Sequence, residues 1–214
     1  DDSSVHAIGA DTGEQQWTFE TGDVIKSSPT AAGDNILIGS GDSNVYAIEQ
    51  TSGEQQWAFE TGGGIVSSPT GTEQSAFIGS GDGNLYAVDS DTGDSQWEYP
   101  AGNSIISSPT VTDGTVFVGD DIGRLHAVNI NTGQQQWRFE TGASIEASPT
   151  VADGTVYIGS FDNSVYALDA AAGTQQWAFD TGVSVESSPT VANETVYIGG
   201  GEFSGRGNDL YAID

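Results

Sequence analysis

A 40-residue repeat runs through this chain of 214 residues and constrains its fold more than any other feature. Proline recurs every 40 residues within Ser-Ser-Pro-Thr or, once, Ala-Ser-Pro-Thr, and tryptophan recurs with the same period. The tryptophans are Trp17, Trp57, Trp97, Trp137 and Trp177. A fixed period of this length is typical of architectures built from one repeated supersecondary unit. We therefore expect one structural unit repeated five times.

Each repeat contains four candidate β-strands. In residues 143–182 the expected strands are Ser144–Val151, Thr155–Gly159, Ser164–Leu168 and Gln175–Phe179. Asp153-Gly154, between the first two, is the signal of a two-residue hairpin turn. The first strand contains a proline, which suits an edge strand that can lack a hydrogen-bond donor. Because no helical periodicity is present, the sequence predicts an all-β chain, with each repeat a four-stranded antiparallel blade of a β-propeller over residues 1–214 as a single domain.

The two ends of the sequence predict how the terminal strands complete the blades. The chain begins with a third strand, Ser4–Ile8, and ends with another, Leu210–Asp214, so six third strands accompany five fourth strands. Pairing the N-terminal fourth strand with the three C-terminal strands would close a five-bladed ring, and the alternative is an open part of a larger propeller. A spare strand is an exposed pairing edge, through which self-association is expected. Residue 1 is not methionine, so we expect a processed product or an excised segment.

The turn that precedes each tryptophan suggests a family. The run from Ala7 to Trp17, with Thr12-Gly13 between them, resembles the tryptophan-docking motif of the pyrroloquinoline-quinone (PQQ)-like propeller repeat. All five copies keep the alanine, the glycine and the tryptophan; the glycines are Gly13, Gly53, Gly93, Gly133 and Gly173. The resemblance implies that each glycine lies in the turn between third and fourth strands and that the tryptophan of one blade packs on the turn of its neighbour.

The resemblance implies a fold more strongly than a chemistry. Quinone-dependent dehydrogenases of the family carry eight such blades, an adjacent cysteine pair and a calcium site, whereas this sequence has five motifs and no cysteine. We expect no cofactor, no metal site and no catalytic residue, and hence no enzyme. Other members, such as the propeller lipoproteins of outer-membrane assembly, use the repeat to hold proteins together and look more similar.

The charge of the chain narrows its partners. It has 31 acidic and 4 basic residues, a net charge of −27, so nucleic acid would be repelled. The charge is either a site for cations or basic partners or an adaptation to molar salt, and its spread through every repeat favours the second. With a single lysine, the composition resembles that of haloarchaeal proteins. No apolar run approaches the ~20 residues of a transmembrane helix. We expect a location outside the cell or on the surface of a halophilic organism.

Two histidines, His6 and His126, fall at the strand position that is tyrosine in the other repeats. An amphipathic ring in a tyrosine position explains them better than a metal ligand or a catalytic base. The sequence therefore offers no catalytic constellation.

A candidate partner-binding surface follows from where the repeats differ. The segments that lead into the first strands vary, as do the loops between second and third strands, and three of the four cations lie in these segments. The candidate residues are Asp23, Lys26, Asp120, Asp121, Arg124, Glu146, Phe161, Glu186, Phe203 and Arg206. Phe161 and Phe203 are expected to be apolar anchors. The alternative is neutral loop drift, with each cation paired to a nearby acid.

These observations favour a non-enzymatic protein-binding or structural scaffold. A propeller that binds small molecules or carbohydrates is the alternative, and a remnant of a PQQ-dependent dehydrogenase is a third. Several similar pockets would favour the second, whereas one asymmetric surface would favour the first.

Overall fold

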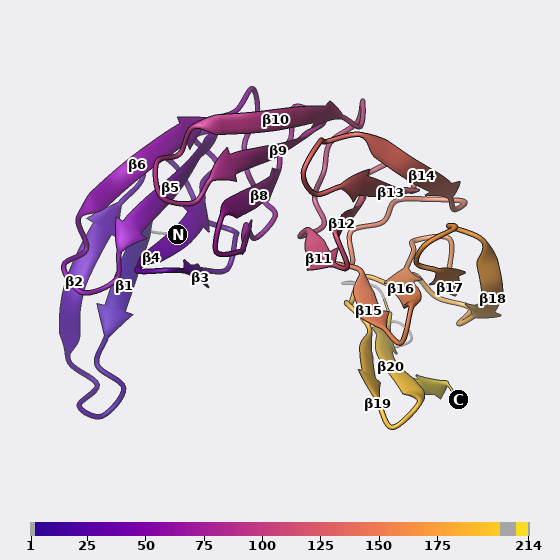
Figure 1. The fold of residues 1–214 in the computed structure, drawn as a ribbon. Helices are drawn as coiled ribbons and strands as arrows, with labels where there is room; N and C mark the ends of the chain where they lie inside the picture. Colours follow the sequence, from indigo (N-terminus) through magenta and orange to yellow (C-terminus); the bar gives the residue numbers. More distant parts are fainter. Residues whose placement is uncertain (1–2, 202–208, 214) are drawn as a thin grey trace. The chain divides into compact units, whose positions relative to one another are not determined.

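The computed structural model describes residues 3–201 and 209–213, and every regular element in them is a β-strand (Figure 1). Contacts divide the chain into two compact units, Asp1–Gly102 and Asn103–Asp214. No helix occurs in the described residues, so none there is long and apolar enough to cross a membrane. The prediction of an all-β chain is confirmed, while the prediction of a single domain over residues 1–214 stays a prediction.

The first unit holds three antiparallel sheets whose strands follow one another in chain order. The two-stranded sheet consists of β1 (Ser4–Ile8) and β2 (Gln15–Glu20). The next sheet consists of β3 (Thr30–Ala32), β4 (Asn35–Gly39), β5 (Asn44–Glu49) and β6 (Gln55–Glu60). The third consists of β7 (Thr70–Gly71), β8 (Ser75–Gly79), β9 (Asn84–Asp89) and β10 (Ser95–Pro100).

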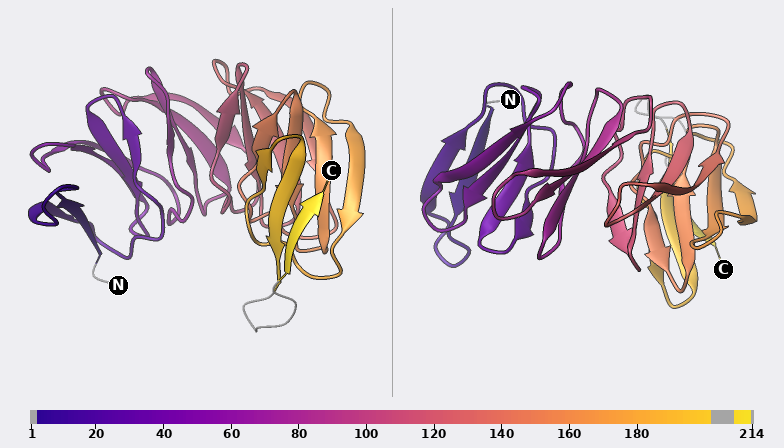
Figure 2. Two further views of the ribbon diagram at one scale, coloured as in Figure 1. Left: turned by 90° about the horizontal axis from the view of Figure 1, so that it is seen from below. Right: turned by 45° about the horizontal axis from the view of Figure 1, so that its top comes forward.

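The second unit repeats the pattern in two four-stranded sheets and one three-stranded sheet, which two views in Figure 2 show from other sides. The first consists of β11 (Thr110–Thr112), β12 (Thr115–Gly119), β13 (Arg124–Asn129) and β14 (Gln135–Glu140). The next consists of β15 (Thr150–Ala152), β16 (Thr155–Gly159), β17 (Ser164–Asp169) and β18 (Gln175–Asp180). The last consists of β19 (Thr190–Ala192), β20 (Thr195–Gly200) and β21 (Asp209–Ile213). The described residues thus contain the six third strands and five fourth strands that the sequence predicts.

The first strand of each repeat is shorter than predicted. Residues 144–151 were expected to be one strand, but β15 covers only Thr150–Ala152, and Pro149 precedes it. The segment before the strand hydrogen-bonds to the next repeat instead of to its own sheet: the Ser148 N–H donates to Ser188 Oγ at 2.9 Å. Thr150 Oγ1 donates to the Pro189 carbonyl at 2.5 Å. Proline lacks the N–H of a ladder, so the inner edge is held by side-chain bonds between repeats.

Turn chemistry explains the remaining strand boundaries. Asp153 and Gly154 have φ of 49° and 75°, the two positive angles of a type I′ turn, which confirms the predicted hairpin. At the far end, β17 and β18 pair with a bulge, because Ala167 lies opposite Trp177 while Leu168 lies opposite Gln175. The bulge sits beside the tryptophan in each of the five third-to-fourth strand pairs. Bulges of this kind re-aim a side chain, here that of the unpaired glutamine.

The core of each unit lies between neighbouring sheets and combines aliphatic with aromatic side chains. In the first unit Leu37, Ile65 and Ile78 are fully buried together, and in the second unit Ile145 and Ile158 are. These side chains come from alternate positions of the second strands and from the segments that lead into the first strands. Burial of the sheets against one another is therefore what holds successive repeats together.

Candidate functional site

Three of the repeated tryptophans contact the following sheet in the same way. Trp17 Nε1 donates to the Gln50 carbonyl at 3.0 Å, and a Cβ added at Gly53 would lie 2.7 Å from the Trp17 ring. The same donor–carbonyl and ring–glycine pairs join Trp57 to Ser90 and Gly93, and Trp137 to Ala170 and Gly173. Gly53, Gly93 and Gly173 have φ between 68° and 76°. Only glycine accepts both the positive φ and the close approach of the ring.

Trp97 and Trp177 each lie beside an aromatic residue of their own sheet, as Trp137 lies beside Phe117. Trp97 is half-buried and lies with its ring centroid 5.8 Å from that of Phe77. Trp177 contacts Tyr157 at 5.9 Å in the same geometry. Gly13 has a φ of 70°, and nothing in the described structure lies within 4 Å of a Cβ added there. Gly133 has a φ of 65° and is buried.

A second repeated contact joins the loop between the second and third strands to the preceding repeat. Tyr46 Oη donates to Asp42 Oδ2 at 2.7 Å, and the same oxygen accepts the Gly22 N–H at 2.6 Å. Partial burial opposes ionisation of Asp42, but these bonds and the Asn44 N–H lower its pKa below the ordinary value. Burial and the nearby carboxylate raise the pKa of Tyr46 to about 12. The pattern recurs at Asp82 and at Asp162.

The repeat that contains His126 replaces this contact with another. Isoleucine 122 stands where the other loops carry the aspartate, and Asp120 stands where they carry serine. His126 Nε2 lies 3.2 Å from Asp120 Oδ2, and both side chains are essentially inaccessible, at 1 % and 0 % exposure. Burial would raise the pKa of Asp120, but the bonds from His126 and from the Arg124 N–H lower it. Because an ionised carboxylate can only accept, Nε2 is the protonated nitrogen.

The sequence prediction that Asp120 is a partner-binding residue is therefore wrong. Its carboxylate is fully buried and bonded inside the sheet, so it does not reach a partner. The signal that could have located the pair was present in the sequence. A histidine in a tyrosine position coincides, in the same repeat, with an aspartate moved by two positions, and the two exchanges compensate each other.

The two variable sets of segments lie side by side in both units, as the surface prediction requires. A backbone bond links the loop to the entry segment of its own repeat: Gly41 N–H to the Val24 carbonyl in the first unit, and Asp121 N–H to the Ser104 carbonyl in the second. Phe161 N–H makes the same bond to Ser144. The loop and the segment that leads into the first strand therefore form one continuous edge.

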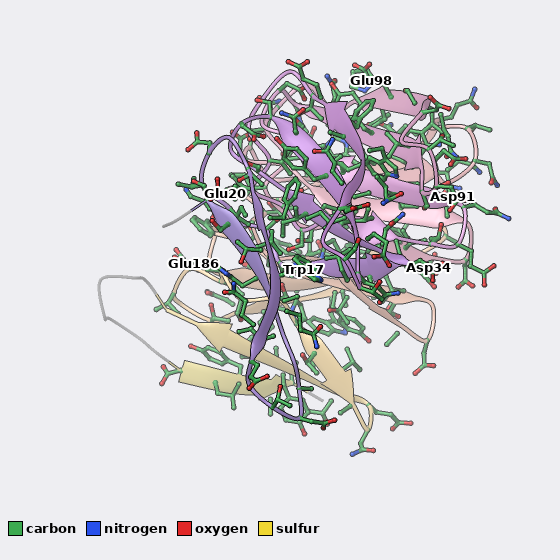
Figure 3. The ribbon with its side chains drawn as sticks, turned by 90° about the vertical axis from the view of Figure 1, so that its left-hand side faces the viewer. Trp17, Glu20, Asp34, Asp91, Glu98 and Glu186 are labelled. Carbon is green, nitrogen blue, oxygen red and sulfur yellow. The ribbon has the colours of Figure 1, made fainter. Side chains whose placement is uncertain are left out.

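In the second unit this edge carries three carboxylates that interact. Glu146 and Glu186 occupy corresponding positions of successive repeats, and Asp121 lies in the loop of the repeat before them. Burial, then the charges of Glu186 and Asp121, raise the pKa of Glu146 above its ordinary value. Phe161 is half-buried in the loop between β16 and β17. Figure 3 labels Glu186. We name Asp121, Glu146, Phe161 and Glu186 the acidic edge.

The other predicted residues fall outside this cluster. In the first unit Asp23 and Lys26 are exposed, and Asp23 Oδ1 accepts the Val24 N–H at 2.7 Å. Arg124 is not a loop residue as predicted, because it begins β13, and its Nε lies 3.7 Å from Glu140 Oε1. That pairing is what neutral loop drift predicts for this cation. Phe203 and Arg206 lie outside the described residues.

The comparison with family models decides the relationship of the chain. A model described as outer membrane protein assembly factor BamB matches residues 1–110 and 100–214. The chain belongs to the BamB family. This membership, with the sheets described above, confirms the predicted PQQ-like β-propeller class. Whether the blades close into a ring of five stays a prediction.

Solved structures agree with the BamB-family fold. BamB from Moraxella catarrhalis superposes with a TM-score of 0.82 at 19% identity, over 98% of this chain and 74% of that one. The computationally designed Ika8 protein gives 0.88 at 15% identity, over 99% of this chain and 65% of that one. Quinohemoprotein alcohol dehydrogenase from Comamonas testosteroni gives 0.72 at 15% identity, over 83% of this chain and 40% of that one. The chain thus spans less than two thirds of the last two. No curated protein matches it.

The dehydrogenase in this set raises the question of whether this BamB-family chain has residues suited to a quinone and a calcium ion. Calcium takes about six to eight oxygen ligands. Within residues 3–201 and 209–213, no group of three or more histidines, aspartates or glutamates could hold a metal ion. The buried carboxylate of Asp120 is already bonded by His126 and by backbone N–H groups. The described residues do not fit such a centre, and we derive no chemistry through it.

Proposed function

We propose that this BamB-family chain is a non-enzymatic scaffold that binds a protein partner through the acidic edge. The observation that carries the proposal is the gathering of Asp121, Glu146 and Glu186 along one edge of the second unit, where burial and then the charges of Glu186 and Asp121 raise the pKa of Glu146. Like charges held together cost free energy in the unbound protein. A basic group of a partner would relieve that cost, so the edge is complementary to a basic surface.

Phe161 gives the edge an apolar element. Its ring is partly accessible in a loop whose backbone is fixed by the bond to Ser144. Aromatic residues surrounded by polar groups are typical centres of protein interfaces. The family supports the same role through its name, since BamB is described as an assembly factor. The tryptophan–glycine contacts would then serve as docking contacts that keep successive blades in register and the edge in shape.

The finer parts of the proposal concern setting and assembly. The scaffold works outside the cell or at the surface of a halophile, where its exposed acids remain hydrated. Glu20, Asp34, Asp91 and Glu98 are exposed members of that set, labelled in Figure 3. Self-association through an edge strand is a second mode of assembly, favoured by β21, where Leu210 is 76 % exposed.

The test is capture of partners in molar potassium chloride with the double variant Glu146→Gln/Glu186→Gln as bait. The matched control is Glu20→Gln/Asp34→Asn, which removes the same charge from exposed positions of the first unit. We expect the first pair to lose the partner that the unaltered chain and the control retain. Because the change removes like-charge repulsion, its melting temperature should not fall.

Equal capture by both double variants would contradict the acidic edge as the contact surface. Phe161→Ala adds an independent test, since loss of an aromatic residue that is a binding hot spot weakens binding by about 2 kcal/mol or more. Retention of the partner by this variant would show that the contact lies elsewhere.

A further inference from the structure

One cavity in the second unit lies away from the acidic edge. It has a volume of ≈ 560 Å³ and opens between the sheets β11–β14 and β15–β18. Its lining comes from the hairpin turn after β11, from β12 and β14, and from the turns after β15 and β17. Ligand sites for small molecules commonly measure about 300–1,000 Å³, so the cavity has the size of one.

Two small residues form part of the wall of this cavity. Ala170 and Ala171 line it, where the corresponding residues of the second repeat are Gln50 and Thr51. The backbone does not change with the side chain, because the carbonyls of Gln50 and Ala170 both accept a tryptophan N–H at 3.0 Å. The short side chains at positions 170 and 171 therefore leave room that glutamine and threonine would occupy.

The polar groups of the cavity are held in place. Gln136 is the unpaired residue of the bulge in β14, since Ala127 lies opposite Trp137 and Val128 opposite Gln135. Thr115 Oγ1 donates to Gln136 Oε1 at 2.9 Å, which fixes the amide and turns its Nε2 donor away from Thr115. The corresponding Gln96 donates its Nε2 to the Gln74 carbonyl at 3.3 Å.

Acceptors and apolar surface complete the lining. Asp169 Oδ1 accepts the N–H groups of Ala171 and Ala172, which orients the carboxylate. Asp113 lies in the hairpin turn, and the accessible methyl groups of Ala170 and Ala171 contribute apolar surface, while Phe117 is fully buried beneath them. Neither lysine, arginine nor histidine is among the described lining residues. The two carboxylates therefore disfavour an anionic ligand.

We infer that this cavity binds a neutral carbohydrate of one or two sugar rings. A sugar hydroxyl both donates and accepts, which matches an amide donor at Gln136, a hydroxyl at Thr112 and carboxylate acceptors at Asp113 and Asp169. The C–H face of a sugar ring matches the apolar surface of Ala170 and Ala171. A cation would bind only to the carboxylates. The amide N–H of Gln136 would then face a positive charge and have no acceptor. The inference is independent of the protein-binding proposal, because the lining residues and the acidic edge share no member.

The experiment uses the whole chain with three neutral disaccharide probes: maltose, cellobiose and N,N′-diacetylchitobiose. Spermidine serves as a cationic probe, and calorimetry and saturation-transfer NMR measure binding. Ala170→Gln fills the cavity with the residue found at position 50, and Gln136→Ala removes the donor. Ala10→Gln and Gln176→Ala are matched controls at corresponding positions of other repeats that do not line the cavity.

We expect at least one disaccharide to bind, with Kd raised about tenfold or more by Gln136→Ala. Ala170→Gln should abolish binding, and the two controls should change Kd by no more than about twofold. Three results would overturn the inference. The first is that no disaccharide binds the unaltered chain. The second is that Ala170→Gln and Gln136→Ala bind a disaccharide as tightly as the unaltered chain does. The third is that spermidine binds instead and that Ala170→Gln abolishes its binding.

Discussion

Position 126 shows how one residue exchange demands others nearby. In three of the loops between second and third strands, an aspartate accepts a hydrogen bond from a tyrosine hydroxyl. At the loop between β12 and β13, Asp120 and His126 form a wholly buried pair instead. Tyrosine reaches the aspartate four positions before it, but the shorter imidazole needs a carboxylate closer to the strand. Moving the carboxylate from position 122 to position 120 meets that need. We therefore expect the residues at positions 120, 122 and 126 to stabilise the fold only as a matching set.

This coupling predicts a non-additive set of variants. Asp120→Ser leaves the buried imidazole without its acceptor and should lower the free energy of unfolding by about 1–3 kcal/mol. The triple variant Asp120→Ser/Ile122→Asp/His126→Tyr restores the residues of the other loops and should recover most of that loss. Urea unfolding midpoints measure both. A triple variant no more stable than the single one would show that the residues act independently.

The lowered carboxylate pKa values predict how the fold responds to acid. For Asp82, hydrogen bonds from Tyr86, Asn84 and Gly62 outweigh partial burial, so its folded-state pKa lies below the ordinary value. A depressed pKa stabilises the fold above the unfolded-state value, near 4, and that contribution is lost as pH falls through the lower folded value.

Asp82→Asn should therefore reduce the dependence of the urea midpoint on pH between about pH 2 and 5. Glu20→Asn is a control, because Glu20 is exposed and accepts no such set of bonds in the described structure. An unchanged pH dependence in Asp82→Asn would contradict the assignment.

At the scale of elements, the contact between a tryptophan and the next turn sets the spacing of the sheets. Gly173 has a φ of 68°, and a Cβ added to it would lie 2.5 Å from Trp137. Gly154 in the same sheet has a φ of 75° with nothing within 4 Å in the described structure. Alanine at either position incurs a similar backbone cost of about 1–2 kcal/mol.

Gly173→Ala should be less stable than Gly154→Ala, because only the first also displaces a packed ring. Such overpacking costs about 1–3 kcal/mol more. Thermal unfolding of the two variants measures the difference. Equal melting temperatures would mean that the ring contact contributes nothing to stability.

The strands were predictable from the sequence because each depends on local pattern. Alternating apolar residues and the Asp153-Gly154 turn determine β16 and its hairpin without help from distant residues. The first strands were predicted too long. Ser148 hydrogen-bonds to the next repeat, and a contact of this kind leaves no signal in the local sequence. The cavity was not predictable either. It depends on the volume of Ala170 beside a glutamine that a bulge re-aims, and periodicity shows neither.

For the whole molecule, charge is the property that repetition does not explain. The strands keep their apolar residues from repeat to repeat, so the acids among the described residues lie mainly in turns and on outward-facing positions. Their mutual repulsion opposes the compact state in dilute buffer, and only 4 cations offset it. The described ion pairs of arginine, those of Arg124 and Arg138, share one acceptor, Glu140. Pairing therefore relieves little of the repulsion, which leaves screening by salt.

Stability should accordingly rise with salt into the molar range. The Debye length falls from about 10 Å at 0.1 M to about 3 Å at 1 M, so repulsion between exposed acids is progressively screened. Melting temperatures at increasing potassium chloride measure the effect, and sodium chloride at equal concentrations should give the same curve because screening does not depend on the identity of the cation. Saturation at millimolar concentrations, or a marked difference between the two cations, would contradict screening and indicate a specific cation site. A midpoint that stays constant or falls with salt would show that the net charge of −27 does not limit stability.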